Sequence, residues 1–121
     1  MKDLKFSMLI DFYGDLLATK MRDSLELYYN EDLSLSEIAE HMNITRQGVR
    51  DNIKRGEQFL NETENRLGFF RRYSRLEEQI EQIQNLALNI CEFNMRHYKS
   101  PEIDQFSKEI VGITKDFQEQ E

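Results

Sequence analysis

The chain has 121 residues and a formal net charge of −7, enough for one compact domain or a small domain with a helical extension, but not for two ordinary cores. The negative charge excludes a protein that holds nucleic acid by its bulk charge, so any such site has to be local. One Pro and five Gly permit long helices with few interruptions, and we predict an all-α fold.

Two helices are expected within the first 30 residues. Apolar residues recur at helical spacing from about residue 3 to residue 17, and a second apolar stripe runs from Met21 to Tyr29. Thr19 is the expected N-terminal cap of the second helix, and Asn30-Glu31-Asp32 is expected to end it. These two helices cannot bury their stripes alone, so they need the helices that follow.

A short helix, a tight turn and a longer helix are predicted next. Ser34 is followed three residues later by Glu37, which is the capping-box arrangement at the start of a helix. Asn43 can adopt the left-handed backbone of a tight turn. Thr45 is expected to cap the next helix, whose apolar positions continue to about Gly68.

Two further long helices are predicted, from about Arg71 to His97 and from Ser100-Pro101 onward. Their expected apolar stripes consist of Leu76, Ile80, Ile83, Ala87, Ile90 and Asn94 in the first helix and of Ile103, Phe106, Ile110, Ile113 and Phe117 in the second. A packed bundle and a coiled coil both fit this spacing.

The predicted organisation is a helix-turn-helix domain over residues 1–68 and a C-terminal helical extension over residues 69–121, which could also form one continuous domain. The last two helices carry more apolar surface than a small helical head can cover. Because such an excess is commonly buried by association, we predict a homodimer formed largely by residues 72–118.

Residues 33–56, LSLSEIAEHMNITRQGVRDNIKRG, have the spacing of a helix-turn-helix. The supporting helix has to cross the second helix closely, which needs a small residue, here Ala39, and apolar residues on both sides of the turn. Residues 45–59 also carry a local charge of +2, from four basic and two acidic residues, inside an acidic chain. The predicted nucleic-acid-binding residues on the outer face are Thr45, Arg46, Gln47, Arg50, Lys54 and Arg55.

These side chains suit double-stranded DNA for separate chemical reasons. Gln47 with Arg46 or Arg50 can bind base edges or phosphates, and the Thr45 hydroxyl with the first-turn amides can hold a phosphate oxygen. The two cations further along the helix suit backbone contacts. The alternative interpretation is a helical hairpin whose basic residues are solvated and serve protein contacts.

The segment resembles region four of bacterial sigma factors, and the motifs DFYGDLL (11–17) and LELYYNEDLSLSEIAEHMNITRQGVRDNIKR (25–55) resemble the YlxM family of helix-turn-helix proteins. The resemblance implies base reading by Arg46, Gln47 and Arg50 and backbone contacts by Thr45 and Lys54. It also implies a regulatory role linked to the signal recognition particle, with the particle RNA or its targeting GTPase as partner. Asn43 in place of the usual turn Gly, and the acidic Asp51, depart from the sigma pattern.

A second arginine-rich cluster allows two interpretations. Arg66, Arg71, Arg72 and Arg75 lie around Phe69, Phe70 and Tyr73. This mixture could stack on single-stranded RNA, but we favour a helix junction whose aromatic rings enter the core and whose arginines cover it.

No other pattern predicts chemistry. His41 and His97 have no partners at metal-ligand spacing, and no phosphate loop or nucleophile motif is present. We therefore expect no enzymatic activity, no catalytic residue, no metal and no cofactor. The single Cys91 is expected to be buried, and no apolar run approaches the roughly 18 residues that span a membrane. The expected location is cytoplasmic, without membrane insertion.

Overall fold

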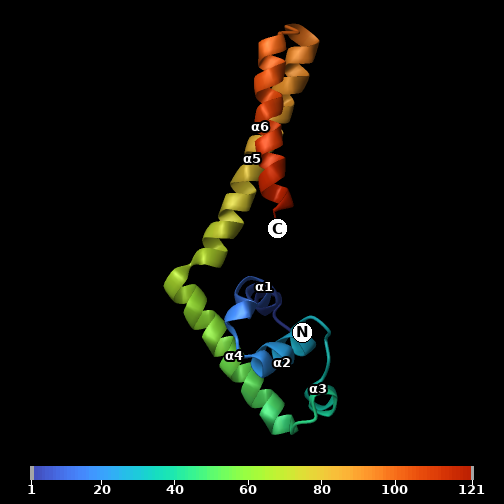
Figure 1. The fold of residues 1–121 in the computed structure, drawn as a ribbon, viewed down its shortest axis with the longest axis vertical. Coiled ribbons are helices and arrows are strands. Elements are labelled where there is room, and N and C mark those ends of the chain that lie inside the picture. The colour runs from blue at the N-terminus through green and yellow to red at the C-terminus, as the bar shows by residue number, and fades with distance from the viewer. Residues whose placement is uncertain (1, 121) are drawn as a thin grey trace. The chain divides into compact units, whose positions relative to one another are not determined.

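The computed structural model describes residues 2–120, and the prediction of an all-α fold is confirmed (Figure 1). The α-helices are α1 (Leu4–Tyr13), α2 (Thr19–Tyr29), α3 (Leu35–Met42), α4 (Arg46–Leu67), α5 (Phe69–His97) and α6 (Pro101–Glu119), with a short 3-10 helix at Gly14–Leu16. The chain divides into two compact units, Met1–Phe70 and Arg71–Glu121. Among the described helices none has the length and apolar character needed to cross a membrane.

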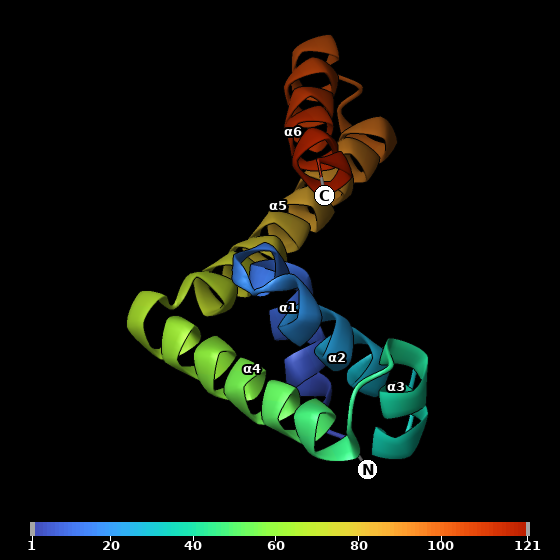
Figure 2. The same ribbon diagram turned by 60° about the horizontal axis from the view of Figure 1, so that its bottom comes forward.

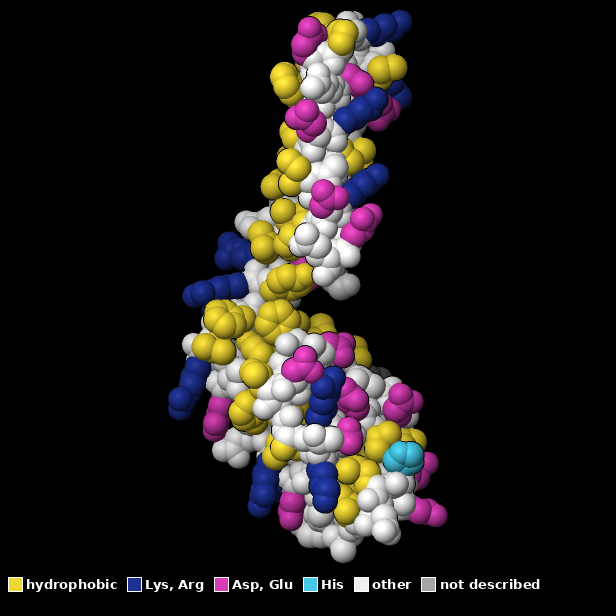
Figure 3. Space-filling model, in the orientation of Figure 1, with side chains coloured by type: hydrophobic (Ala, Val, Ile, Leu, Met, Phe, Trp, Pro, Cys, Tyr) yellow, Lys and Arg dark blue, Asp and Glu magenta, His cyan; other side chains and the backbone are white. Residues whose placement is uncertain are grey.

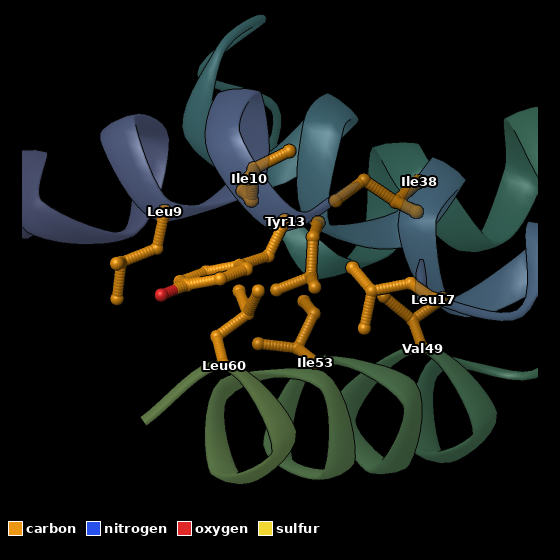
Figure 4. Packing of buried hydrophobic residues seen from close by; sticks show 9 residues of the cluster. Leu9, Ile10, Tyr13, Leu17, Ile38, Val49, Ile53 and Leu60 are labelled. Carbon is orange, nitrogen blue, oxygen red and sulfur yellow. The ribbon is translucent and has the colours of Figure 1, made fainter. Parts of the chain in front are cut away.

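The first unit packs α1, α2 and α3 against the long helix α4 (Figure 2). Its core consists of buried aliphatic side chains and one tyrosine from all four helices and from the segment after α1: Leu9, Ile10, Tyr13, Leu17, Leu25, Ile38, Val49, Ile53 and Leu60 (Figure 4). Burial of each large aliphatic side chain contributes about 1.5–3 kcal/mol. The core therefore fixes α4 against its three neighbours, which matters for the face that α4 turns outward.

Two expectations at the start of the chain were wrong in detail. The first α-helix ends at Tyr13, and the 3-10 turn that follows brings Leu17 into the core in extended conformation. Thr19 is already inside α2, and the capping position belongs to Ala18, whose side chain forms no hydrogen bond.

The second unit consists of α5 and α6, whose contact is made mainly by small and polar side chains. Its buried residues are Ala87, Asn94, Ser107, Val111 and Thr114. Asn94 donates to the carbonyl of Ser100 at 2.9 Å and accepts from the backbone N–H of Ser100 at 3.0 Å, which fixes the turn between the helices. The predicted start of a new helix at Ser100-Pro101 is confirmed, and the Ser100 hydroxyl caps it by accepting from the backbone N–H of Ile103.

The predicted apolar stripes do not form this contact. Of the α5 stripe only Ala87 and Asn94 are buried, and the α6 stripe leaves all its large aliphatic residues exposed. Small and polar residues occupy the contact, whereas the large apolar residues of both helices lie on an adjoining face. Cys91 is half-buried rather than buried, and its thiol donates to the Ser107 hydroxyl at 2.9 Å.

Candidate nucleic-acid interface

The turn between α3 and α4 is built from local capping interactions that the sequence predicted. Ser34 and Glu37 form the reciprocal capping box at the start of α3. The Ser34 backbone N–H holds the pKa of the Glu37 carboxyl below its usual value. Asn43 adopts the left-handed conformation, with φ of 56°, and the Thr45 hydroxyl accepts from the backbone N–H of Gly48 at 2.9 Å. The start of α4 is therefore fixed relative to α3.

The rotation of α4 about its own axis is fixed by its buried face. Val49, Ile53 and Leu60 enter the core at helical spacing, whereas the apolar Phe59 and Leu67 of the same helix remain exposed. Gly56 lies where α2 crosses α4, and a Cβ placed there would come within 2.4 Å of Leu25 Cδ1. This glycine permits a close approach that no larger residue allows without movement of the core.

All six predicted contact residues of the interface are exposed: Thr45, Arg46, Gln47, Arg50, Lys54 and Arg55. With 100° between successive residues of an α-helix, Arg46, Arg50, Lys54 and Gln47 lie within one arc of α4. The arc begins beside the buried face at Arg46 and turns away from that face toward Lys54 and Gln47. Arg55 lies a further 100° beyond Lys54, so the structure does not bring it into this group. We call Arg46, Gln47, Arg50 and Lys54 the basic strip.

The cations of the basic strip form no ion pair within the described part of the chain. By contrast, Arg22 pairs with Asp15 at 2.7 Å and with Glu26 at 3.2 Å. Basic groups that are exposed and unpaired in an acidic protein keep their full charge for a ligand.

The two acids near the basic strip differ in their exposure and in their hydrogen-bond partners. Glu57 is turned toward α2, where its carboxylate accepts from the Tyr29 hydroxyl at 2.7 Å, and burial together with this bond raises the pKa of Tyr29. Asp51 stays exposed at the edge of the strip and accepts from Gln47 Nε2 at 3.0 Å. The local positive charge is therefore interrupted by one carboxylate.

One residue of this surface was missed by the sequence analysis. Gln58 follows Lys54 by four residues, is exposed, and extends the surface by one turn, where its amide donates to Glu62 at 3.1 Å. The helical spacing from Gln47 through Lys54 could have identified it.

The second arginine-rich cluster has its aromatic rings partly packed. Phe70 is half-buried, with its ring 5.7 Å from that of Phe12, and the ring of Tyr73 lies 6.0 Å from that of Phe117. These contacts agree with the helix-junction interpretation, whereas Phe69 remains exposed. Within residues 2–120 no three side chains of the metal-ligating types converge.

Comparison with known proteins gives one consistent result. The family described as "Putative helix-turn-helix protein, YlxM / p13 like" (UPF0122) matches residues 1–98, which include the whole interface. A UPF0122 protein of Acetivibrio thermocellus is 42% identical over 93% of this chain and 87% of its own length. Similar proteins of Desulforamulus reducens and Exiguobacterium sibiricum are 39% and 44% identical, over 92% and 72% of this chain and 88% and 82% of their own lengths.

Proposed function

Because the chain belongs to the UPF0122 (YlxM/p13-like) family, we propose that it is a regulatory protein that binds double-stranded DNA by placing α4 in a major groove. The observation that carries this proposal is the basic strip. Its three cations are exposed and form no ion pair among residues 2–120, and they lie on a helix whose start and rotation are both fixed. A helix of this kind fits the major groove, which is about 12 Å wide.

The chemistry of the strip supports a division of roles. Arg50 and Gln47 carry the forked guanidinium and the amide that pair with base edges, and they lie in the first turns of α4, the part that enters a groove. Thr45 and the first-turn amides suit a phosphate oxygen, since the N-terminus of a helix favours negative charge. Lys54 lies further along and suits the DNA backbone. These are binding groups, and we propose a binding protein rather than an enzyme.

A second candidate function has one specific observation in its favour. Asp51 adds a carboxylate to the strip, and the chain as a whole carries −7, and both weaken attraction to a duplex. An accessory factor of the signal recognition particle that contacts its targeting GTPase would tolerate this charge, whereas contact with the particle RNA would meet the same repulsion from phosphates. Its helix-turn-helix would then serve as a scaffold.

Parallel titrations separate the two functions. The full chain is titrated against a random-sequence duplex pool, the particle RNA and the targeting GTPase, in the same buffer at several salt concentrations. The DNA proposal expects binding to the duplex pool that weakens steeply with added salt, because phosphate contacts release counterions. Binding to the RNA or the GTPase without binding to DNA would instead support the accessory function, and binding to none of the three would refute both.

A further inference from the structure

The hairpin of α5 and α6 leaves an apolar face open, formed by one stripe from each helix. We call it the hairpin face, and its large side chains are Ile83, Leu86, Ile90 and Phe93 of α5 and Ile103, Phe106, Ile110 and Ile113 of α6. All eight are exposed, up to 63% for Leu86 and 69% for Ile113. Figure 3 shows hydrophobic side chains on the surface along this hairpin.

Both stripes lie on the same side of the hairpin. An open groove of about 580 Å³ is lined by Leu86, Ile90 and Phe93 from α5 and by Ile103 from α6, with Tyr98 from the turn between them. Because one groove takes side chains from both helices, the two stripes form one continuous surface. Projecting side chains such as Phe106, which is 60% exposed, extend this surface along α6.

The closing of the hairpin does not use this face. The contact between α5 and α6 relies on Ala87, Asn94, Ser107, Val111 and Thr114. Such small and polar residues remove little apolar area from water, so they contribute little hydrophobic stabilisation. The large apolar residues of the hairpin remain available, and the second unit gains most of its possible apolar burial only when the face is covered.

The face has no charged group at the positions that define it. On α5, Gln79 and Gln82 share the helical spacing of the apolar stripe, and no Asp, Glu, Lys or Arg falls within it between residues 76 and 94. On α6 the stripe from Ile103 to Phe117 is apolar throughout. An acidic or basic partner would find no complement here, so the occupant has to present an apolar, uncharged surface.

We propose that the hairpin face binds a second copy of this chain, with the same face of each copy at the interface. Two copies with a charge of −7 each repel one another over most of their surfaces, and the hairpin face is where they can meet without burying charge. The face also holds both a groove and projections. In a two-fold arrangement the projections of each copy can therefore fill the groove of the other.

The area of the face fits this occupant. With about half of each large side chain open, and aromatic side chains of about 150–250 Å² only at Phe93 and Phe106, the face exposes on the order of 500 Å² of apolar surface. That is toward the upper end of the largest apolar patch of a typical monomer, about 300–600 Å², and it would form the apolar centre of an interface to which each partner contributes about 800 Å². The inference is independent of the proposed DNA contact.

Sedimentation equilibrium of the full chain with two matched double variants tests the proposal. Leu86→Glu with Phe106→Glu adds two carboxylates to the face, whereas Asn85→Glu with Gln105→Glu adds the same charge at the neighbouring positions, both exposed and both turned away from it. We expect the wild type and the Asn85/Gln105 variant to be dimers. The Leu86/Phe106 variant should dissociate at least about 100-fold more readily, because the interface would bury unpaired charge.

Hydroxyl-radical footprinting of the wild type supplies a measurement that needs no variant. Phe93 and Phe106 should become protected as the concentration rises from low to high micromolar. Met95, which is 59% exposed and lies two residues beyond Phe93 on the other side of α5, should stay reactive. A monomeric wild type, a dimer unaffected by the Leu86/Phe106 change, or equal protection of Met95 would each overturn the proposal; a monomer would leave the face for another protein.

Discussion

The side chain of Gln47 is joined to that of Asp51, one turn further along α4, by a hydrogen bond of 3.0 Å from Nε2 to Oδ1. The bond keeps the carboxylate of Asp51 beside a residue that we propose to contact a base. While it persists, the amide of Gln47 is oriented, but one of its donors is occupied. Whether Asp51 hinders or directs DNA binding can therefore be measured at this pair.

Replacing Asp51 by Asn should increase affinity for a random-sequence duplex. The change removes a negative charge from an exposed position beside three cations, keeps the size of the side chain, and leaves an amide that can still bond to Gln47. We expect a gain of roughly 3- to 10-fold at low salt, which shrinks as salt is added. Fluorescence anisotropy with labelled duplexes measures it.

The matched control for Asp51→Asn is Asp11→Asn, which removes an exposed acid of α1 outside the interface. It changes the net charge equally, so an equal gain in both variants would show that only bulk charge matters. A loss of affinity in Asp51→Asn would mean that the carboxylate itself contacts a base, as a carboxylate does with the amino group of cytosine.

Replacing Arg46 and Arg50 by Ala should weaken duplex binding by about 10-fold or more while leaving helix content unchanged. Both side chains are exposed and have no acidic partner in the described part of the chain, so their loss disturbs no contact of the fold. The lost contacts carry charge, so the slope of affinity against salt should also become shallower.

Lys20→Ala with Lys115→Ala is the control for the arginine pair, since it removes two exposed cations that lie outside the basic strip. Binding to duplex should then stay within about 3-fold of the wild type if local contacts dominate. Circular dichroism of all variants verifies the fold. Equal losses for the arginine pair and the lysine pair would contradict the assignment of the interface.

The local features of the interface could be predicted because short-range signals determine them. The capping box of Ser34 and Glu37, the left-handed Asn43 and the cap at Thr45 each involve residues at most three positions apart. No tertiary contact is needed to recognise them. The exposure of the basic strip followed from the apolar positions of the same helix.

The features that escaped prediction depend on partners far along the chain. The Glu57 side chain is turned away from the outer surface because its carboxylate accepts a hydrogen bond from Tyr29, 28 residues earlier. No periodicity within α4 predicts that bond. The contact of α6 with α5 could not be predicted from the apolar stripes, because small and polar residues such as Ser107 and Thr114 make it.

The capping box should make the stability of the first unit sensitive to acid. The pKa of Glu37 is lowered in the folded state. Its contribution to the free energy of unfolding is therefore present above the ordinary carboxyl pKa of about 4.3, and it is lost as the pH falls through the pKa of the folded state. Glu37→Gln should therefore lose less stability than the wild type between neutral pH and about pH 3. Thermal melts monitored by circular dichroism measure the difference.

Glu40→Gln is the control for the acid experiment, because Glu40 lies in the same helix, is exposed, and its carboxylate accepts no hydrogen bond among the described residues. Its acid sensitivity should match that of the wild type. If the stability of the wild type and of the Glu37→Gln variant fell equally with decreasing pH, the hydrogen bonds of Glu37 would contribute nothing to the acid sensitivity.

Two glycine substitutions should change stability in opposite directions. At Gly56 a Cβ would lie 2.4 Å from Leu25 Cδ1, and Leu25 is completely buried, so Gly56→Ala forces the core to shift. Overpacking of this kind costs about 1–3 kcal/mol, of which the better helix propensity of Ala recovers about 0.5–1 kcal/mol. At Gly112 an added Cβ meets nothing within 4 Å, so Gly112→Ala should give the propensity gain alone. Urea unfolding should show a lower midpoint for Gly56→Ala and a higher midpoint for Gly112→Ala than for the wild type. A Gly56→Ala variant that is more stable than the wild type would mean that α2 and α4 are not held in close contact at this crossing.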